Sequence, residues 1–474
     1  MNNNYEGCPC TLNTTRICGD TPIDASIEVS KIGFADMRPN TVILVNENEV
    51  FDGIAASSLV HFPFNAPILY TDGNTLSKKT LEEIQRLSPK GYQEIQVILV
   101  GNIAKAVSLE LTFHGFNTEQ MVGHNHYETA TMVCDFREVF DNIIIMSGED
   151  YTEGIASAYW AAHHGSPILY VQKNNIPRCT FEEITKMKNV NVYILGSTKT
   201  VSKSVELSLE QIRNVKRVQR IEGNSIYDIA VNFAKYKDEE TGFGWDRDYR
   251  AGHAFTFGDI NQPMSIIAGV VFAHMGKHTP LLLVEKDKVP MIVESYIDSV
   301  KPLPPKDMPK PPFMHGFIMG NLESISYEVQ KSLEKYLSID YEMMGMDSKI
   351  EIIENVPDII EELKQKIKEK KHNINIGNAV KGKEDVELTH EKNSDFYTQP
   401  EMIKMEHKNL DKGREVLAES KDNCSVDMNK FKKYCMNHSD KDLVNFVNYE
   451  IGYEYIAEKV KFDCLIIGVR DLID

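Results

Sequence analysis

The sequence predicts an α/β fold made of three tandem parallel-sheet repeats, because one strand–helix–strand pattern occurs three times. The pattern is clearest in residues 142–170, where the continuous apolar run 143–146 predicts a strand buried on both faces. Small residues at 155–162 then favour a closely packed helix before a second strand, which is typical of a parallel crossover unit. Residues 41–70 repeat the pattern almost letter for letter, and residues 254–284 repeat it more loosely.

Further helices and strands complete each repeat. The first repeat is predicted to begin with a helix at 24–32 and a strand at 42–45, and later to have a strand at 97–101. The other repeats keep this order, with third strands at 192–196 and 317–320. A serine follows each of these strands, and its hydroxyl is suited to accept an amide hydrogen bond at the start of the next helix. The predicted caps are Ser108, Ser202 and Ser326.

The spacing of the repeats predicts the domain organisation. Gly19, Gly123 and Gly223 begin the repeats and lie 104 and 100 residues apart, which is a common domain size. The predicted parts are repeat 1 at 14–115, repeat 2 at 116–215, repeat 3 at 216–340 with an insertion at 238–252, a charged helix and linker at 341–410, and a small, mainly helical segment at 411–474. Because the insertion and the C-terminal segment are additions to a shared scaffold, we expect them to supply contacts for assembly.

Composition excludes several classes of partner and site. The formal net charge is -18 without a large basic tract, so nucleic acid and anionic membranes are not expected partners. No stretch of about 18 apolar residues is present, so we expect no transmembrane segment. The cysteines are mostly far apart in sequence, which predicts reduced thiols rather than a disulfide framework. Since no ligand spacing or cofactor motif is evident, we expect no metal and no cofactor.

Candidate ligand-binding residues lie where strands end. A glycine follows the third strand of each repeat, and free amides beside a helix start can bind an anion. The alternative is that turns in parallel α/β units need small residues in any case. The candidates are Gly101 with Asn102, Gly196 with Ser197, and Gly320 with Asn321.

Two carboxylates follow the first strands of their repeats. Asp52 and Glu153 could act as acid, base or metal ligand, or each could be a helix N-terminal carboxylate favoured by the helix dipole. The third repeat has Met264 at this position. Neither of two histidine pairs has an evident carboxylate or nucleophile partner, so we predict no catalytic residue. These pairs are His124 with His126, and His163 with His164, which we expect to be a dipole-stabilised surface pair.

The motifs resemble the clostridial cell wall binding type 2 repeat, which usually occurs in three tandem copies. Its opening motif is visible as Arg16-Ile17-Cys18-Gly19 and Arg220-Ile221-Glu222-Gly223, and its closing motif as Ile194-Leu195-Gly196 followed by Val201-Ser202. The resemblance implies Toprim-like or flavodoxin-like units in a pseudo-threefold arrangement. It also implies non-covalent attachment to an anionic cell wall polymer.

Our functional hypothesis is a non-enzymatic binding or scaffold protein, because the three copies share packing residues rather than reactive ones. Its expected partners are a cell wall polysaccharide or another protein. The alternative is an intracellular enzyme or assembly subunit that reuses the repeat fold. The lack of a secretion signal at the start of the sequence favours the cytoplasm, whereas the family resemblance favours the cell wall or cell surface.

Overall fold

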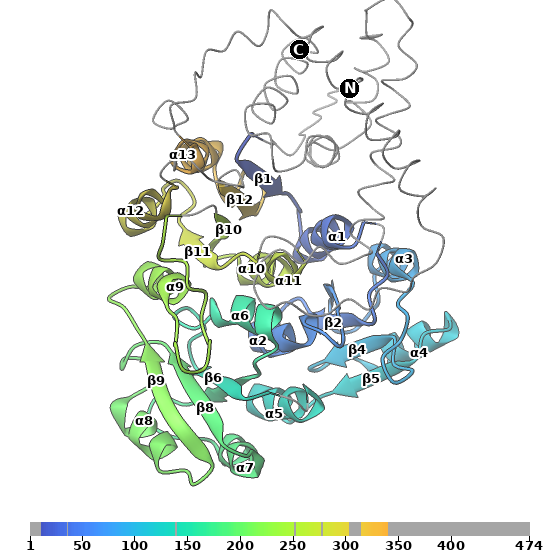
Figure 1. Cartoon of the computed structure of the whole chain (residues 1–474). Coiled ribbons are helices and arrows are strands. Elements are labelled where there is room, and N and C mark those ends of the chain that lie inside the picture. The colour runs from blue at the N-terminus through green and yellow to red at the C-terminus, as the bar shows by residue number, and fades with distance from the viewer. Residues whose placement is uncertain are drawn as a thin grey trace, which may run out of the picture. The chain divides into compact units, whose positions relative to one another are not determined.

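The three predicted repeats correspond to three four-stranded sheets in which every neighbouring pair of strands is parallel (Figure 1). A computed structural model describes residues 11–339, apart from residues 36, 138–139, 251–252, 276–277 and 303–313. The α/β fold is thereby confirmed. The predicted linker and C-terminal segment at 341–474 lie outside the described residues.

All three sheets have the same strand order. Sheet one runs β3 (Ile68–Thr71), β2 (Val42–Asn46), β4 (Val97–Val100) and β5 (Thr118–Met121). Sheet two runs β7 (Ile168–Val171), β6 (Asn142–Ser147), β8 (Val190–Leu195) and β9 (Val215–Ile221). Sheet three runs β11 (Leu281–Val284), β10 (His253–Asp259), β12 (Met314–Met319) and β1 (Thr14–Ile17). The inner strands are short, buried and mostly apolar, as expected for a parallel sheet covered on both faces.

The fourth strand of sheet three comes from the other end of the repeat region. In sheets one and two, the fourth strand directly precedes the first helix of the next repeat in the chain. Within the described residues no repeat follows sheet three, and β1 fills this position by pairing with β12 from Thr14↔Gly316 to Ile17↔Met319. The sequence ranges proposed for the repeats therefore do not coincide with whole sheets, since each sheet ends with a strand from beyond its range.

Helices follow the strands in equivalent places. The repeats open with α1 (Pro22–Gly33), α5 (His126–Arg137) and α9 (Ile226–Lys235). After the first strand come α2 (Val50–Ala56) with a 3₁₀ turn η1 (Ser57–Val60), α6 (Ser157–His164), and α10 (Pro263–Ala268) with α11 (Val271–His274). After the second strand come α3 (Lys78–Leu87), α7 (Arg178–Lys186) and α12 (Met291–Val300). After the third strand come α4 (Lys105–Phe113), α8 (Lys203–Glu210) and α13 (Tyr327–Leu337).

The predicted serine caps differ in outcome. Ser108 is not a cap, because α4 begins after Ala104 and the Ser108 hydroxyl donates to the carbonyl of Lys105 from inside the helix. Ser202 and Ser326 do occupy the N-cap positions of α8 and α13, although neither hydroxyl accepts a capping hydrogen bond. The reason for the error is local: the strand-end loop of the first repeat closes with Ala104 where the other two have serine.

Tyrosines join the repeats where the middle helices meet. Helix α6 contacts both η1 and α11, and α10 contacts α2, so all three repeats share one buried region. Tyr70 donates a 2.7 Å hydrogen bond to the carbonyl of Met264 in α10, and Tyr170 donates a 2.5 Å bond to that of Phe51 in α2. Both tyrosines end the repeated Pro-Ile-Leu-Tyr sequence, while the third copy has Leu283. This sequence therefore encodes contacts between repeats as well as a strand.

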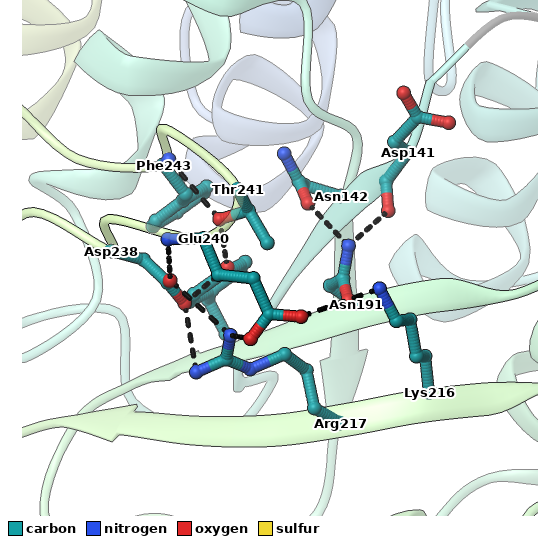
Figure 2. Close-up of polar contacts among 10 residues, drawn as sticks. Asp141, Asn142, Asn191, Lys216, Arg217, Asp238, Glu240, Thr241 and Phe243 are labelled. Carbon is teal, nitrogen blue, oxygen red and sulfur yellow. Dashed lines mark hydrogen bonds and ion pairs between the residues drawn. The ribbon is translucent and has the colours of Figure 1, made fainter.

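The insertion of repeat 3 packs back onto sheet two. Its Asp238 accepts hydrogen bonds from Tyr193 on β8 (2.8 Å) and Arg217 on β9 (3.2 Å), and Figure 2 shows Arg217 reaching Glu240 as well. The Phe243 ring stacks on Tyr193 with centroids 3.7 Å apart. These contacts tie repeat 3 to the sheet of repeat 2. The prediction that the insertion also contacts a partner remains a prediction.

One cysteine departs from the expected state. Cys18 is disulfide-bonded, which contradicts the expectation of reduced thiols, whereas Cys134 and Cys179 carry free thiols. Within the described residues, no helix combines the length and apolar character needed to cross a membrane.

Candidate functional site

The strand-end glycines form three equivalent loops. Gly101, Gly196 and Gly320 follow β4, β8 and β12 with φ of 86°, 137° and 146°, a backbone region that favours glycine. In each loop, a side chain on the neighbouring fourth strand donates to the glycine carbonyl. The donors are Gln120 at 3.1 Å from Gly101, Arg220 at 2.8 Å from Gly196, and Arg16 at 2.9 Å from Gly320. The glycine carbonyls are thus held in place, and the next residues face the helix that follows the first strand.

In repeat 2, the predicted residues meet as one hydrogen-bonded group. The Glu153 carboxylate accepts from the Ser197 amide at 2.7 Å and from the Thr200 hydroxyl at 2.6 Å through Oε2. Its Oε1 accepts from the Ser197 hydroxyl at 3.0 Å. The free amide predicted as an anion site is therefore already bound to an anion, which is the protein's own carboxylate.

In repeat 1, the predicted residues are adjacent but not hydrogen-bonded. Asp52 lies against Gly101, since a Cβ on that glycine would stand 2.0 Å from Asp52 Oδ2. The Asp52 side chain is only 5% exposed, and its Oδ1 has no hydrogen-bond partner within the described chain. Burial, with a smaller contribution from Glu49, raises the pKa of Asp52 from 3.8 to about 7. Asn102 is exposed.

In repeat 3, a serine stands in the position of the two carboxylates. Helix α2 begins after Glu49, and α10 begins after Gln262, so Asp52 and Ser265 are each the third residue of their helix. The expected equivalence with Met264 is wrong by one residue. Repeat 3 has diverged so far in sequence that its alignment with the other repeats can be fixed only from the position where the helix begins. Ser265 is too short to fill the space that the carboxylates occupy.

A pocket of about 320 Å³ lies at this end of sheet three. Ser265, Asn321, Ser324 and Lys286 are among the residues that line it. The loop repeats the geometry of repeat 2: Ser324 donates to the carbonyl of Asn321 at 3.0 Å, as Thr200 does to the carbonyl of Ser197 at 3.2 Å. Repeat 3 therefore keeps the donors of the loop without the carboxylate that they bind in repeat 2.

The histidine pairs differ from their predicted settings. His124 does have a carboxylate partner, Glu128, at 2.7 Å. His163 is not part of a charged surface pair, because its Nδ1 lies 3.1 Å from Nδ1 of His278 and burial holds the pKa of His163 well below 6.5. Within the described residues, no group of three or more His, Cys, Asp or Glu side chains is arranged to hold a metal ion.

Comparisons with known proteins agree with this arrangement. The family model for cell wall binding domain 2 (CWB2) matches residues 120–206. The chain is 29% identical over 306 residues to the amidase enhancer of Bacillus subtilis (strain 168), a match that covers 64% of this chain and 38% of that protein. It is 25% identical over 223 residues to the N-acetylmuramoyl-L-alanine amidase LytC of the same organism, covering 46% and 42%.

Two solved structures share the fold. Cwp6 from Clostridium difficile superposes with a TM-score of 0.58 at 17% identity, covering 71% of this chain and 50% of that one. Cwp8 from the same organism gives 0.55 at 20% identity, covering 71% and 52%. The chain therefore contains a cell wall binding domain 2 (CWB2) match at residues 120–206 and shares the fold of Cwp6 and Cwp8. It spans about half or less of the length of these relatives.

The opening motif has a structural role that its sequence does not reveal. Arg16 and Arg220 are largely buried. Each lies on the fourth strand of a sheet and donates a hydrogen bond to the strand-end glycine carbonyl of that sheet. Gln120 performs the same role with a neutral amide. The motif therefore supports the strand-end loops and does not present these arginines to an anionic polymer.

Sequence reasoning missed five residues of the strand-end loops and the pocket. Thr200 follows its glycine by four positions, as Ser324 does, and this shared spacing is the signal that could have identified both. The carbonyl of Lys286 accepts a hydrogen bond at 2.8 Å from the amide of the serine that precedes α13. The carbonyl of Lys173 accepts the equivalent bond at 2.9 Å from the serine that precedes α8. No comparable signal marked Ser265, because its role depends on the helix start.

Proposed function

We propose that this chain is a non-enzymatic cell wall binding protein whose three repeats form one scaffold for attachment. The observation that carries the proposal is the shared construction of the repeats. Equivalent residues join the sheets and hold the strand-end loops in place, and residues 120–206 match the model of a cell wall binding domain. A protein selected for a reaction would instead be expected to concentrate unusual chemistry in one copy.

The same reasoning favours the cell surface as its location. The comparisons give no support to the cytoplasmic location that the sequence favoured. The disulfide at Cys18 is in keeping with an oxidising compartment outside the cytoplasm. Fractionation of native cells into cytoplasm, wall extract and medium, followed by detection of this chain, tests the location directly. Recovery from the cytoplasm alone would contradict it.

Wall binding itself is tested by sedimentation. The purified full chain is mixed with cell walls from the native organism and spun, and the bound fraction is measured by gel. We expect saturable binding to intact walls. The matched control uses the same walls after chemical removal of their anionic polymer, which should abolish binding if that polymer is the ligand. No binding to intact walls would refute the proposed function.

Similarity to the amidase enhancer favours a second candidate, in which the chain acts together with a wall amidase. Adding the purified chain to a wall-amidase reaction and following the release of soluble wall fragments tests it; an unchanged rate would remove this candidate. The other hypothesis, an intracellular enzyme, predicts an activity that Asp52→Asn or Glu153→Gln removes while the protein stays folded.

A further inference from the structure

We propose that the pocket at the end of sheet three binds the carboxylate of a sugar acid, in the position that the Glu153 carboxylate fills in repeat 2. The site comprises the Asn321 amide, the Ser324 hydroxyl, Ser265 and Lys286. The choice of a sugar as the carrier of the carboxylate rests on the proposed wall-binding function. The carboxylate itself is inferred from the protein's own repeats.

The first step is that the donors match. In repeat 2, two residues of the loop bind the carboxylate. Ser197, directly after the glycine, binds it through its amide, and Thr200, four residues after the glycine, binds it through its hydroxyl. The corresponding groups in repeat 3 are the Asn321 amide and the Ser324 hydroxyl. Each loop is also folded by the same internal bond, since Ser197 Oγ accepts from the amide two residues on at 3.2 Å, and Asn321 Oδ1 does so at 3.1 Å.

The second step is that repeat 3 lacks the carboxylate that lies beside the strand-end glycine in the other two repeats. A Cβ placed on Gly196 would meet the Glu153 side chain, and one placed on Gly101 would meet Asp52. The three atoms nearest to a Cβ placed on Gly320 belong to Ser324 and Ile325, where the other two glycines have a carboxylate side chain among the nearest atoms. Within the described residues, the Asn321 amide has no hydrogen-bond acceptor, whereas the Ser197 amide has one. A buried or half-buried amide donor without an acceptor is the kind of group that a ligand satisfies.

The third step concerns size and charge. A volume of about 320 Å³ lies at the lower end of small-molecule pockets and is enough for one sugar ring. Lys286 supplies one positive charge and has no ion-pair partner within the described chain, while Asp20 and Glu323 add two negative charges at the lining. This balance favours a singly charged carboxylate held mainly by hydrogen bonds over a doubly charged phosphate monoester.

The test is a calorimetric titration of the full chain with glucuronate, glucose and inorganic phosphate. We expect one equivalent of glucuronate to bind, and neither glucose nor phosphate to bind measurably. Ser265→Glu restores an internal carboxylate and should weaken glucuronate binding by roughly tenfold or more, because the donors are then taken. Conversely, Glu153→Ser should open the equivalent site of repeat 2, where Lys173 stands in place of Lys286, and raise the stoichiometry to two.

Several results would overturn the inference: equal binding of glucose and glucuronate, preferential binding of phosphate, or unchanged affinity in folded Ser265→Glu. If Ser265→Glu does not fold by circular dichroism, Lys286→Met decides, since Lys286 is exposed and unchanged affinity in that variant would also overturn it. The wall sedimentation assay separates the two proposals. Wall binding without glucuronate binding would refute only the proposal for the pocket. Absence of wall binding would refute the proposed function.

Discussion

Asp52 provides a quantitative test of the strand-end geometry. Its pKa in the folded protein is raised from 3.8 to about 7, mainly by burial. The folded state therefore holds this proton more tightly than the unfolded state does. The resulting stabilisation is fully present below pH 3.8 and is lost as the pH rises through about 7. A shift of roughly 3 pH units corresponds to about 4 kcal/mol in the free energy of unfolding.

The perturbation is Asp52→Asn, which keeps the shape of the side chain and cannot ionise. At pH 8 we expect the variant to be more stable than the wild type by as much as about 4 kcal/mol, because the wild type must bury a charge without a partner. At pH 4 the two proteins should be nearly equal. Urea unfolding followed by far-UV circular dichroism at pH 4, 6 and 8 gives the two profiles.

Glu153→Gln is the matched control at the equivalent position of repeat 2. Glu153 accepts three hydrogen bonds, so its replacement should destabilise the protein at pH 8 by about 1–3 kcal/mol. The two substitutions remove the same charge and are expected to act in opposite directions. Parallel pH profiles for wild type and Asp52→Asn, or a less stable Asp52→Asn at pH 8, would refute the reasoning, since either means that the Asp52 carboxylate is adequately solvated or paired.

Three further predictions follow from the packing. Tyr70→Phe and Tyr170→Phe should each cost about 1 kcal/mol in urea unfolding, because each removes one buried hydrogen bond between repeats; no change would mean that these bonds contribute nothing. Gly101→Ala should cost more than about 2 kcal/mol, since φ is 86° and the new Cβ meets Asp52; the double variant with Asp52→Ala should recover part of it, and full additivity would exclude the clash. Phe243→Ala should cost about 3 kcal/mol and make the insertion a preferred site of limited proteolysis, whereas an unchanged digestion pattern would show that the insertion is held by its ion pairs.

The sequence was sufficient to predict the repeated architecture because each inner strand is a continuous apolar run with a turn behind it. Ile143–Met146 and Val97–Val100 can be buried only in a sheet covered on both faces, and both are inner strands. The strand-end glycines were also predictable, since their place after a strand is a local property. What remained hidden was every feature that depends on a partner far along the chain.

Two examples show the limit. Thr14–Ile17 is too short and too polar to be recognised as a strand by itself, and its partner β12 lies about 300 residues away. Ser265 cannot be recognised as a site residue from its own sequence, because it is notable only for replacing a carboxylate that the other two repeats have at the equivalent position. Local patterns can identify elements, but pairing between distant strands and the loss of a shared group appear only when the copies are placed in register.

The pairing of β1 with β12 also governs the order in which the molecule can be completed. During synthesis, the first strand emerges long before the sheet that will receive it, and until then its backbone groups have no partner in the chain. Any interruption that removes β12 leaves two strands without their shared neighbour, β1 and β10, each with an unpaired sheet edge. Such edges can pair with strands of other molecules, so a truncated product would be expected to aggregate.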